Sequence, residues 1–254
     1  MKTIKTILFT LSLFMLTSCE IVQETRFEAN GSGKYSLGFD LSEMMKMGES
    51  TEQGENNQQL DTLIVFSDFL ETKKDSISKL SKEKQEKIKQ LENFSVYIKV
   101  DSIAKKFEMK INYDFANVSE LKLFAEKLKG QNIKELELLS SKTGDLKKGE
   151  GNEIPDFNKS YNTIFNRKLF SLKISPEGLI EAEKNKDTTM TKENPMADMI
   201  RFKSRYHFPY KIKKVTNENV RILPDFKGVE ISGNLFEINN NPNYFDVDIE
   251  FEQD

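Results

Sequence analysis

The chain has no tryptophan, one histidine and one cysteine among its 254 residues. A single histidine excludes any metal site that needs two imidazole ligands, and a single cysteine excludes an internal disulfide and a zinc site built on several thiolates. The sequence also lacks a phosphate-binding glycine loop, a dinucleotide-binding glycine pattern and a Gly-x-Ser-x-Gly motif. The fold must therefore be stabilised by its hydrophobic core alone, and no common catalytic or cofactor motif is present.

Neither basic nor acidic residues are in large excess. The sequence contains 38 basic and 41 acidic residues, and removal of Lys2 and Lys5 with a signal segment would leave a net charge of −5. General nucleic-acid binding usually requires a large basic excess, so we expect no nucleic-acid partner. Hydrophobic residues make up 37% of the chain and aromatic residues 10%, which is enough for a sizeable core.

Long hydrophobic runs are missing apart from one near the N-terminus. Lys2 and Lys5 precede an apolar stretch from Ile7 to Leu16. Ten helical residues span about 15 Å, roughly half of the hydrocarbon core of a bilayer. The stretch is therefore too short for a transmembrane anchor and is typical of a secretion signal, so residues 1–18 are predicted to be a signal peptide.

The only cysteine directly follows this stretch. Leu16, Thr17, Ser18 and Cys19 resemble the lipobox of bacterial lipoproteins, which has Leu three residues before Cys and small residues between them. The resemblance implies cleavage before Cys19, a diacylglyceryl thioether on its thiol and acylation of its amine, for example with palmitate. One acyl chain anchors a protein only marginally, whereas two or three anchor it durably. The alternative is a conventional signal peptide that leaves an unmodified thiol, a liability in an exported protein.

The mature chain alternates between strand patterns and short helical patterns. Period-two hydrophobic alternation predicts strands at residues 25–29, 34–40, 94–100, 107–115, 170–174, 199–212, 220–223, 229–232 and 244–252. Helices are expected at 41–47, 67–93 and 119–129, the last capped by Ser119, and a short one after Ser175-Pro176. We expect an α+β fold with a mostly antiparallel β-sheet and helices packed on one face.

Two polar segments interrupt the pattern. Residues 48–61 contain almost no hydrophobic side chains, so weak order is expected there. Residues 140–159, rich in Gly, Lys, Glu and Asn, are predicted to be a linker or loop between an N-terminal half (19–139) and a C-terminal half (160–254). The two halves could also form one continuous domain.

Candidate reactive side chains are few. His207 is the only histidine and lies on the polar face of its predicted strand, where a structural role is expected more than proton transfer. Carboxylates are plentiful, but none has the spacing of a calcium loop. We therefore assign no catalytic residue, no metal ligand and no cofactor, and expect a protein that is not an enzyme. A carboxylate-dependent envelope hydrolase is the alternative.

The predicted strand around His207 also carries a row of basic residues. Such a row could bind phosphate groups of lipids, or it could pair with acidic residues on a neighbouring strand, where each opposite pair contributes about 0.2–1 kcal/mol. We favour pairing with the last strand of the chain, whose acidic residues alternate with apolar ones. The basic row is Arg201, Lys203 and Arg205, extended by Lys211 and Lys213, and the acidic row is Asp246, Asp248, Glu250 and Glu252.

The whole chain resembles the envelope lipoproteins that are common in Bacteroidota. The likeness rests on Thr17-Ser18-Cys19, on the turn Asn30-Gly31-Ser32-Gly33-Lys34-Tyr35 with Asp40-Leu41-Ser42 after it, and on Tyr206-His207-Phe208-Pro209 leading to Lys213-Lys214-Val215. It implies no activity. In that phylum, a cluster of acidic residues just after the lipidated cysteine is associated with display on the cell surface. Here Glu20 is the only acidic residue directly after Cys19. We expect an outer-membrane lipoprotein on the periplasmic face, and the alternative is display on the cell surface. We also expect the protein to bind a partner protein or an apolar ligand.

Overall fold

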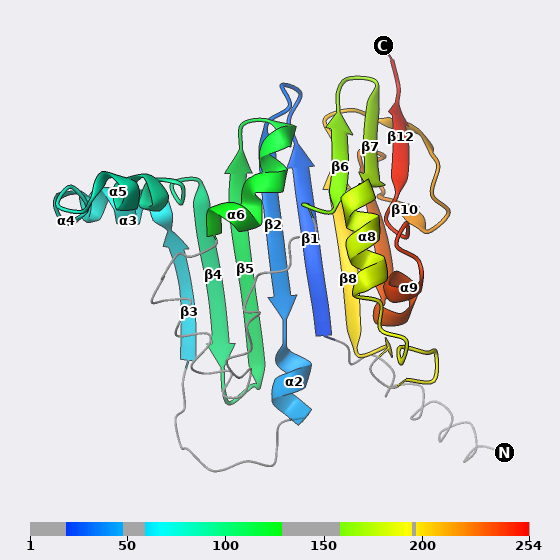
Figure 1. Cartoon of the computed structure of the whole chain (residues 1–254), viewed down its shortest axis with the longest axis horizontal. Helices are drawn as coiled ribbons and strands as arrows, with labels where there is room; N and C mark the ends of the chain where they lie inside the picture. Colours follow the sequence, from blue (N-terminus) through cyan, green and yellow to red (C-terminus); the bar gives the residue numbers. More distant parts are fainter. Residues whose placement is uncertain (1–18, 48–58, 129–157, 195–196, 254) are drawn as a thin grey trace.

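The computed structural model describes residues 19–47, 59–128, 158–194 and 197–253. The predicted signal peptide and most of the two polar segments lie outside this part of the chain. The described residues form two β-sheets and several short helices (Figure 1). The expected α+β class is confirmed.

The larger sheet has eight strands in the order β10-β11-β8-β1-β2-β5-β4-β3. All neighbours are antiparallel except β1 and β8, which are parallel. The sheet combines strands from the segments 19–139 and 160–254. Its strands are β1 (Cys19–Phe27), β2 (Gly33–Asp40), β3 (Gln59–Val65), β4 (Phe94–Asp101), β5 (Lys106–Phe115), β8 (Ile200–His207), β10 (Val220–Ile222) and β11 (Gly228–Asn234).

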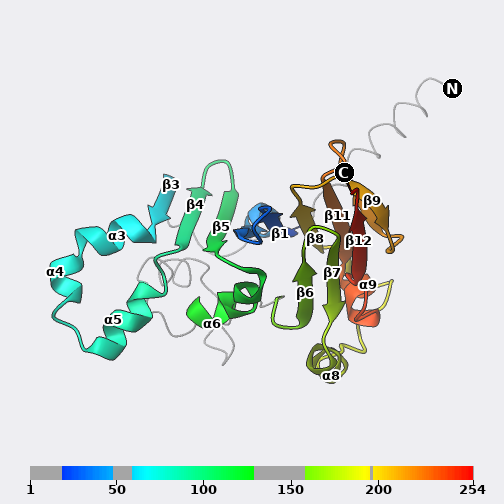
Figure 2. The same cartoon turned by 90° about the horizontal axis from the view of Figure 1, so that it is seen from above.

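A smaller antiparallel sheet packs against one end of the larger one (Figure 2). Five phenylalanines meet between the two sheets, and the ring of Phe27 on β1 stacks on that of Phe165 at 4.5 Å between ring centroids. The other three are Phe170, Phe208 and Phe251. The strands of this sheet, in spatial order, are β6 (Tyr161–Phe165), β7 (Leu169–Ile174), β12 (Val247–Phe251) and β9 (Ile212–Val215).

One face of the larger sheet is covered and the other is polar. Leu37, Ile111 and Val96 are neighbours across β2, β5 and β4, and all three are buried. Helix α6 (Phe124–Leu128) covers this region, with the Phe124 ring 4.7 Å from that of Tyr35. The one-sided sheet predicted from the alternation is therefore present, but the smaller sheet shares the covering with the helices.

The remaining helices are short and lie at the ends or beyond the edge of the sheets. Helices α3, α4 and α5 form an arm that projects past β3 (Figure 1). Their bounds are α2 (Ser42–Met47), α3 (Phe66–Thr72), α4 (Lys74–Ile77), α5 (Lys82–Lys89), the 3-10 helix η2 (Val118–Leu123), α8 (Pro176–Lys184) and α9 (Leu235–Asn240).

Several local expectations need correction. The single strand expected at 199–212 is two strands in different sheets, because Pro209 has no N–H to donate and the chain turns away after His207. Phe208 instead donates its N–H to Lys227 O. The N-cap of η2 is Asn117, two residues before the expected Ser119. Strands β3 and β6 and helix α9 were not expected.

Candidate functional site

Cys19 is the first residue of β1, a central strand of the larger sheet. Its N–H donates to Met199 O at 2.8 Å, and the residue is 4% exposed. An N-acylated Cys19 would keep an amide N–H and could make the same bond. A lipid on its thiol would require the side chain to turn out of the end of the sheet. The lipidation of Cys19 stays a prediction.

Two members of the basic row on β8, Lys203 and Arg205, pair with acidic residues on the strands to either side. Lys203 forms an ion pair with Glu20 of β1. Arg205 donates to Glu230 of β11 at 2.5 Å, and Arg221 of β10 donates to the other oxygen of the same carboxylate at 2.8 Å. The row is therefore part of an ion-pair network across the polar face, which favours a structural role over phosphate binding.

The expected partner strand of this row was wrong. β12 lies in the smaller sheet, so its acidic residues cannot reach β8. Asp248 instead pairs with Lys173 of β7 at 2.9 Å. Glu250 lies 4.0 Å from Lys213 of β9, which is the one pair foreseen between the two rows.

Glu230 is the most buried carboxylate of the network, at 8% exposure. Burial alone would raise its pKa, but the hydrogen bonds from Arg205 and Arg221 outweigh burial and lower the pKa below its usual value. Glu230 was not singled out in the sequence, where Gly228-Val229-Glu230-Ile231 reads as an ordinary alternating strand. Its importance depends on the two arginines that the fold brings to it.

His207 ends β8 beside Glu24 of β1. Its Nε2 lies 3.5 Å from Glu24 Oε1. Burial lowers the pKa of His207 and the neighbouring Arg26 lowers it further, although Glu24 opposes this in part. The lowered pKa favours the neutral form of the imidazole, and the structural role of His207 stays a prediction.

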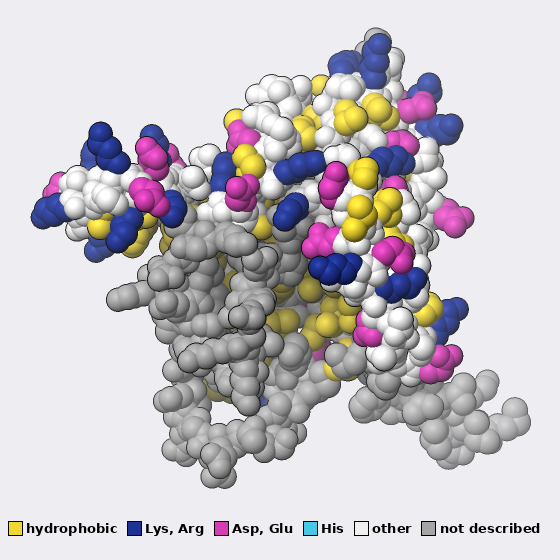
Figure 3. All heavy atoms as spheres, viewed as in Figure 1, with side chains coloured by type: hydrophobic (Ala, Val, Ile, Leu, Met, Phe, Trp, Pro, Cys, Tyr) yellow, Lys and Arg dark blue, Asp and Glu magenta, His cyan; other side chains and the backbone are white. Residues whose placement is uncertain are grey.

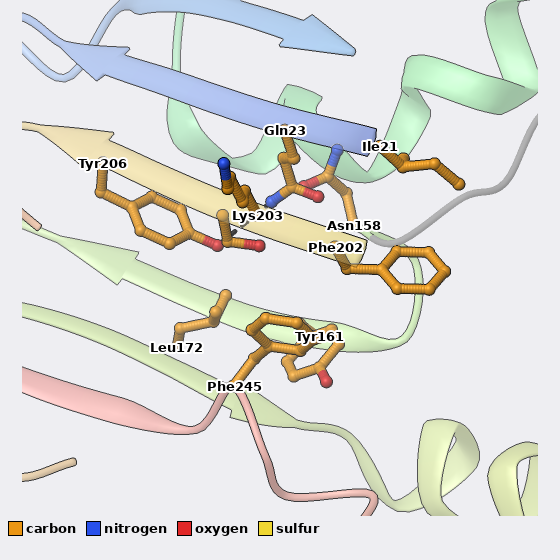
Figure 4. A pocket seen from close by; sticks show the side chains of 10 residues that line it. Ile21, Gln23, Asn158, Tyr161, Leu172, Phe202, Lys203, Tyr206 and Phe245 are labelled. Carbon is orange, nitrogen blue, oxygen red and sulfur yellow. Dashed lines mark hydrogen bonds between the residues drawn. The ribbon is translucent and has the colours of Figure 1, made fainter. Parts of the chain in front are cut away.

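A small cavity lies between the two sheets, with a volume of about 20 Å³. Gln23 of β1 donates to Tyr206 Oη at 3.1 Å (Figure 4). It also accepts from Tyr35 Oη at 3.4 Å. The amide nitrogen of Asn158 is buried and has no hydrogen-bond partner in the described part of the chain. The lining is Ile21, Gln23, Asn158, Tyr161, Leu172, Phe202, Lys203, Ser204, Tyr206 and Phe245.

The size of this cavity limits what it can hold. A site needs about 10–15 Å³ for one water molecule, so the cavity has room for a water but not for an acyl chain. Asn158 falls in the segment predicted to be a linker, yet it is 6% exposed and lies against both sheets. Sequence patterns could not identify it, because a lone asparagine in a polar stretch carries no periodic signal.

No cluster of three or more His, Cys, Asp or Glu residues suited to a metal ion occurs among the described residues. The pKa of Asp248 is shifted downward, because hydrogen bonds from Ser171 and Lys173 outweigh its burial. A general acid needs a raised pKa, so Asp248 and Glu230 have the electrostatics of structural ion pairs. Within the same residues, no helix is long and apolar enough to cross a bilayer.

Comparison with known proteins gives little further information. No protein-family model matches the chain, and no curated protein matches it. One solved structure, the NMR structure of the folded domain of LppM from Mycobacterium tuberculosis, is 8% identical over 93% of this chain and 90% of its own, with a TM-score of 0.35. A TM-score this low shows neither a shared fold nor a shared function.

Proposed function

We propose that this chain is an outer-membrane lipoprotein without enzymatic activity, anchored through Cys19 on the periplasmic face, whose α+β domain binds a partner. The observation that carries the proposal is the sequence Leu16-Thr17-Ser18-Cys19, which begins at the last residue of a ten-residue apolar run. The position of Cys19 at the start of β1 supports it, because the anchor would then be continuous with the folded domain.

Of the two expected kinds of partner, a protein fits the described surface better than an apolar ligand. The inter-sheet cavity has room for about one water, whereas exposed apolar side chains occur outside it. The second candidate, a carboxylate-dependent hydrolase, is not favoured by any carboxylate environment described above.

Labelling with radioactive palmitate tests the anchor. Cys19→Ala should abolish labelling and leave an unprocessed precursor, because both the acylated thiol and the cleavage signal are lost. Thr17→Ser is the matched control: it keeps a small residue in the lipobox and should be labelled and processed normally. A labelled and processed Cys19→Ala protein would refute the anchor.

The side of the membrane needs a separate measurement. In intact cells a periplasmic domain should resist added protease until the outer membrane is opened. Digestion of the domain in intact cells would contradict the periplasmic placement and leave the anchor itself standing.

A further inference from the structure

Among the described residues, strand β3 is the longest open edge of either sheet. The two sheets end in β10, β9, β6 and β3, which have three, four, five and seven residues. Within the described residues β3 pairs with β4 on one side and with no strand on the other. Alternate N–H and C=O groups of an edge strand point outward, and they form a ready template for a further strand.

β3 lacks most of the sequence features that usually protect an edge. Its sequence, Gln-Leu-Asp-Thr-Leu-Ile-Val, contains no lysine, arginine, proline or glycine. Its pairing with β4 runs through all seven residues without a register shift. The edge strand β9, by contrast, carries Lys213 and Lys214, and the three-residue β10 is soon followed by Pro224.

Apolar side chains are exposed along this edge on both faces of the sheet. Leu63 is 60% exposed and lies across from Tyr97, while Leu60 is 40% exposed and lies across from Val100 on the covered face. The only charge on the strand is Asp61, whose carboxylate is 3.3 Å from Lys99 Nζ of β4 and remains largely exposed.

The helical arm extends the apolar surface. Phe69 of α3 and Leu80, just before α5, are both exposed, and neither α4 nor α5 buries a side chain. Figure 3 shows hydrophobic side chains on the lower side of the arm. Helices in proteins draw most of their stability from packing of an apolar face, so this arm gains stability when a partner covers it.

We propose that β3 binds an extended segment of a partner protein, which adds to the larger sheet as a ninth strand. Main-chain hydrogen bonds supply affinity in this mode, and side-chain contacts select the partner. The segment fits best with apolar residues beside Leu60 and Leu63 and a basic residue beside Asp61. The proposal rests on the partner-binding part of the proposed function and is independent of the anchor.

A second copy of the chain fits this edge less well. Two antiparallel β3 strands would be related by a two-fold axis perpendicular to the sheet. Cys19 and the first residue of β3 lie at the same end of the sheet. The strand register shows this, because Glu20 pairs with Asp40, Asp40 pairs with Glu108, and Gln59 pairs with Asp101. The two copies would then carry their anchors at opposite ends, and both could reach one membrane only with the sheet lying flat.

A peptide copy of β4, Phe94–Asp101, is a direct probe, because this sequence already pairs with β3 and places Lys99 opposite Asp61. The protein for the test is residues 19–254 with Cys19→Ser, which keeps every described strand and every residue of the main hydrophobic core cluster. The peptide should protect the outward-facing amides of β3 from hydrogen exchange, and a scrambled peptide should not.

Leu63→Lys should weaken binding of the peptide by about tenfold or more, because an inserted lysine blocks edge pairing. Ile180→Lys is the control: Ile180 of α8 is 71% exposed and far along the chain from β3. Both variants should melt at the temperature of the parent protein.

Absence of β3 protection at millimolar peptide, or equal binding of the peptide by Leu63→Lys and the parent, would overturn the proposal. If light scattering shows a dimer that Leu63→Lys dissociates, the strand that binds to β3 comes from a second copy of the chain and not from a partner protein. None of these results depends on palmitate labelling.

Discussion

At the scale of single residues, Glu230 shows how position changes the role of an ordinary side chain. Its carboxylate accepts hydrogen bonds from Arg205 and Arg221, which come from strands on either side of β11. A buried carboxylate without such partners would be costly. Three strands are therefore linked by one acidic residue on the polar face of the sheet.

Glu230→Gln should lower the free energy of unfolding by about 1–2 kcal/mol at pH 7, because charge-assisted hydrogen bonds are lost at a site that Arg221 leaves partly open to solvent. Since folding lowers the pKa of Glu230 below 4.5, its contribution is present above pH 4.5 and is lost as the pH falls through the folded pKa. The difference between variant and parent, measured by urea denaturation, should therefore shrink from pH 7 to pH 3.5.

The control for this prediction is Glu250→Gln, in the acidic row predicted from the sequence. Glu250 lies 4.0 Å from Lys213 and both side chains are exposed, so its replacement should change stability by less than about 0.5 kcal/mol. Equal effects of the two substitutions at every pH would contradict the distinction between the buried and the exposed carboxylate.

At the scale of secondary structure, the signal for an element can be present and still be weak. Helix α9 has only six residues, too few for a clear hydrophobic period. Its start carries a capping box, in which Asn234 and Glu237 each accept from the other's backbone N–H at 2.9 Å. The spacing Asn-x-x-Glu is readable in the sequence, and it is the signal that could have predicted this helix.

Asn234→Ala should destabilise the protein by about 1 kcal/mol, because one N–H of the first turn of α9 loses its acceptor. Asn234→Ser keeps a capping oxygen and should restore most of that loss. The free energies of unfolding of the two variants, compared by urea denaturation, decide the point. Equal stability of the Ala and Ser variants would show that the cap contributes nothing measurable.

At the scale of the whole molecule, the two sheets share one aromatic core. Phe27 of the larger sheet contacts Phe165 and Phe170 of the smaller one, at 4.5 and 5.5 Å between ring centroids. Phe208 joins this cluster from the segment in which the chain passes from β8 to β9. The two sheets are therefore expected to unfold together.

Phe27→Ala should lower stability by about 3–5 kcal/mol, because it removes a buried aromatic ring and leaves a cavity between the sheets. Circular dichroism and tyrosine fluorescence should still report one coincident transition. Ile180→Ala, at an exposed helical position, should stay within about 0.5 kcal/mol of the parent. Two separate transitions in the parent protein would contradict a shared core.

Local sequence patterns predicted much of the fold. The period-two segments at 34–40, 94–100 and 107–115 are strands β2, β4 and β5, since alternation depends only on which face each side chain takes. The α+β class followed from the same patterns, and so did the one polar face. The prediction for Cys19 also rests on sequence alone, because a lipobox is recognised along an extended chain before folding.

Only the tertiary structure decided which elements are neighbours. Alternation assigns a face to each strand but does not say which strand lies beside it, so the basic row of β8 was matched to β12, whereas Lys203 and Arg205 pair with Glu20 and Glu230. The burial of Asn158 and the open edge of β3 likewise depend on contacts between residues far apart in the chain. Such contacts leave no local trace in the sequence, because each is determined by how whole strands and sheets pack.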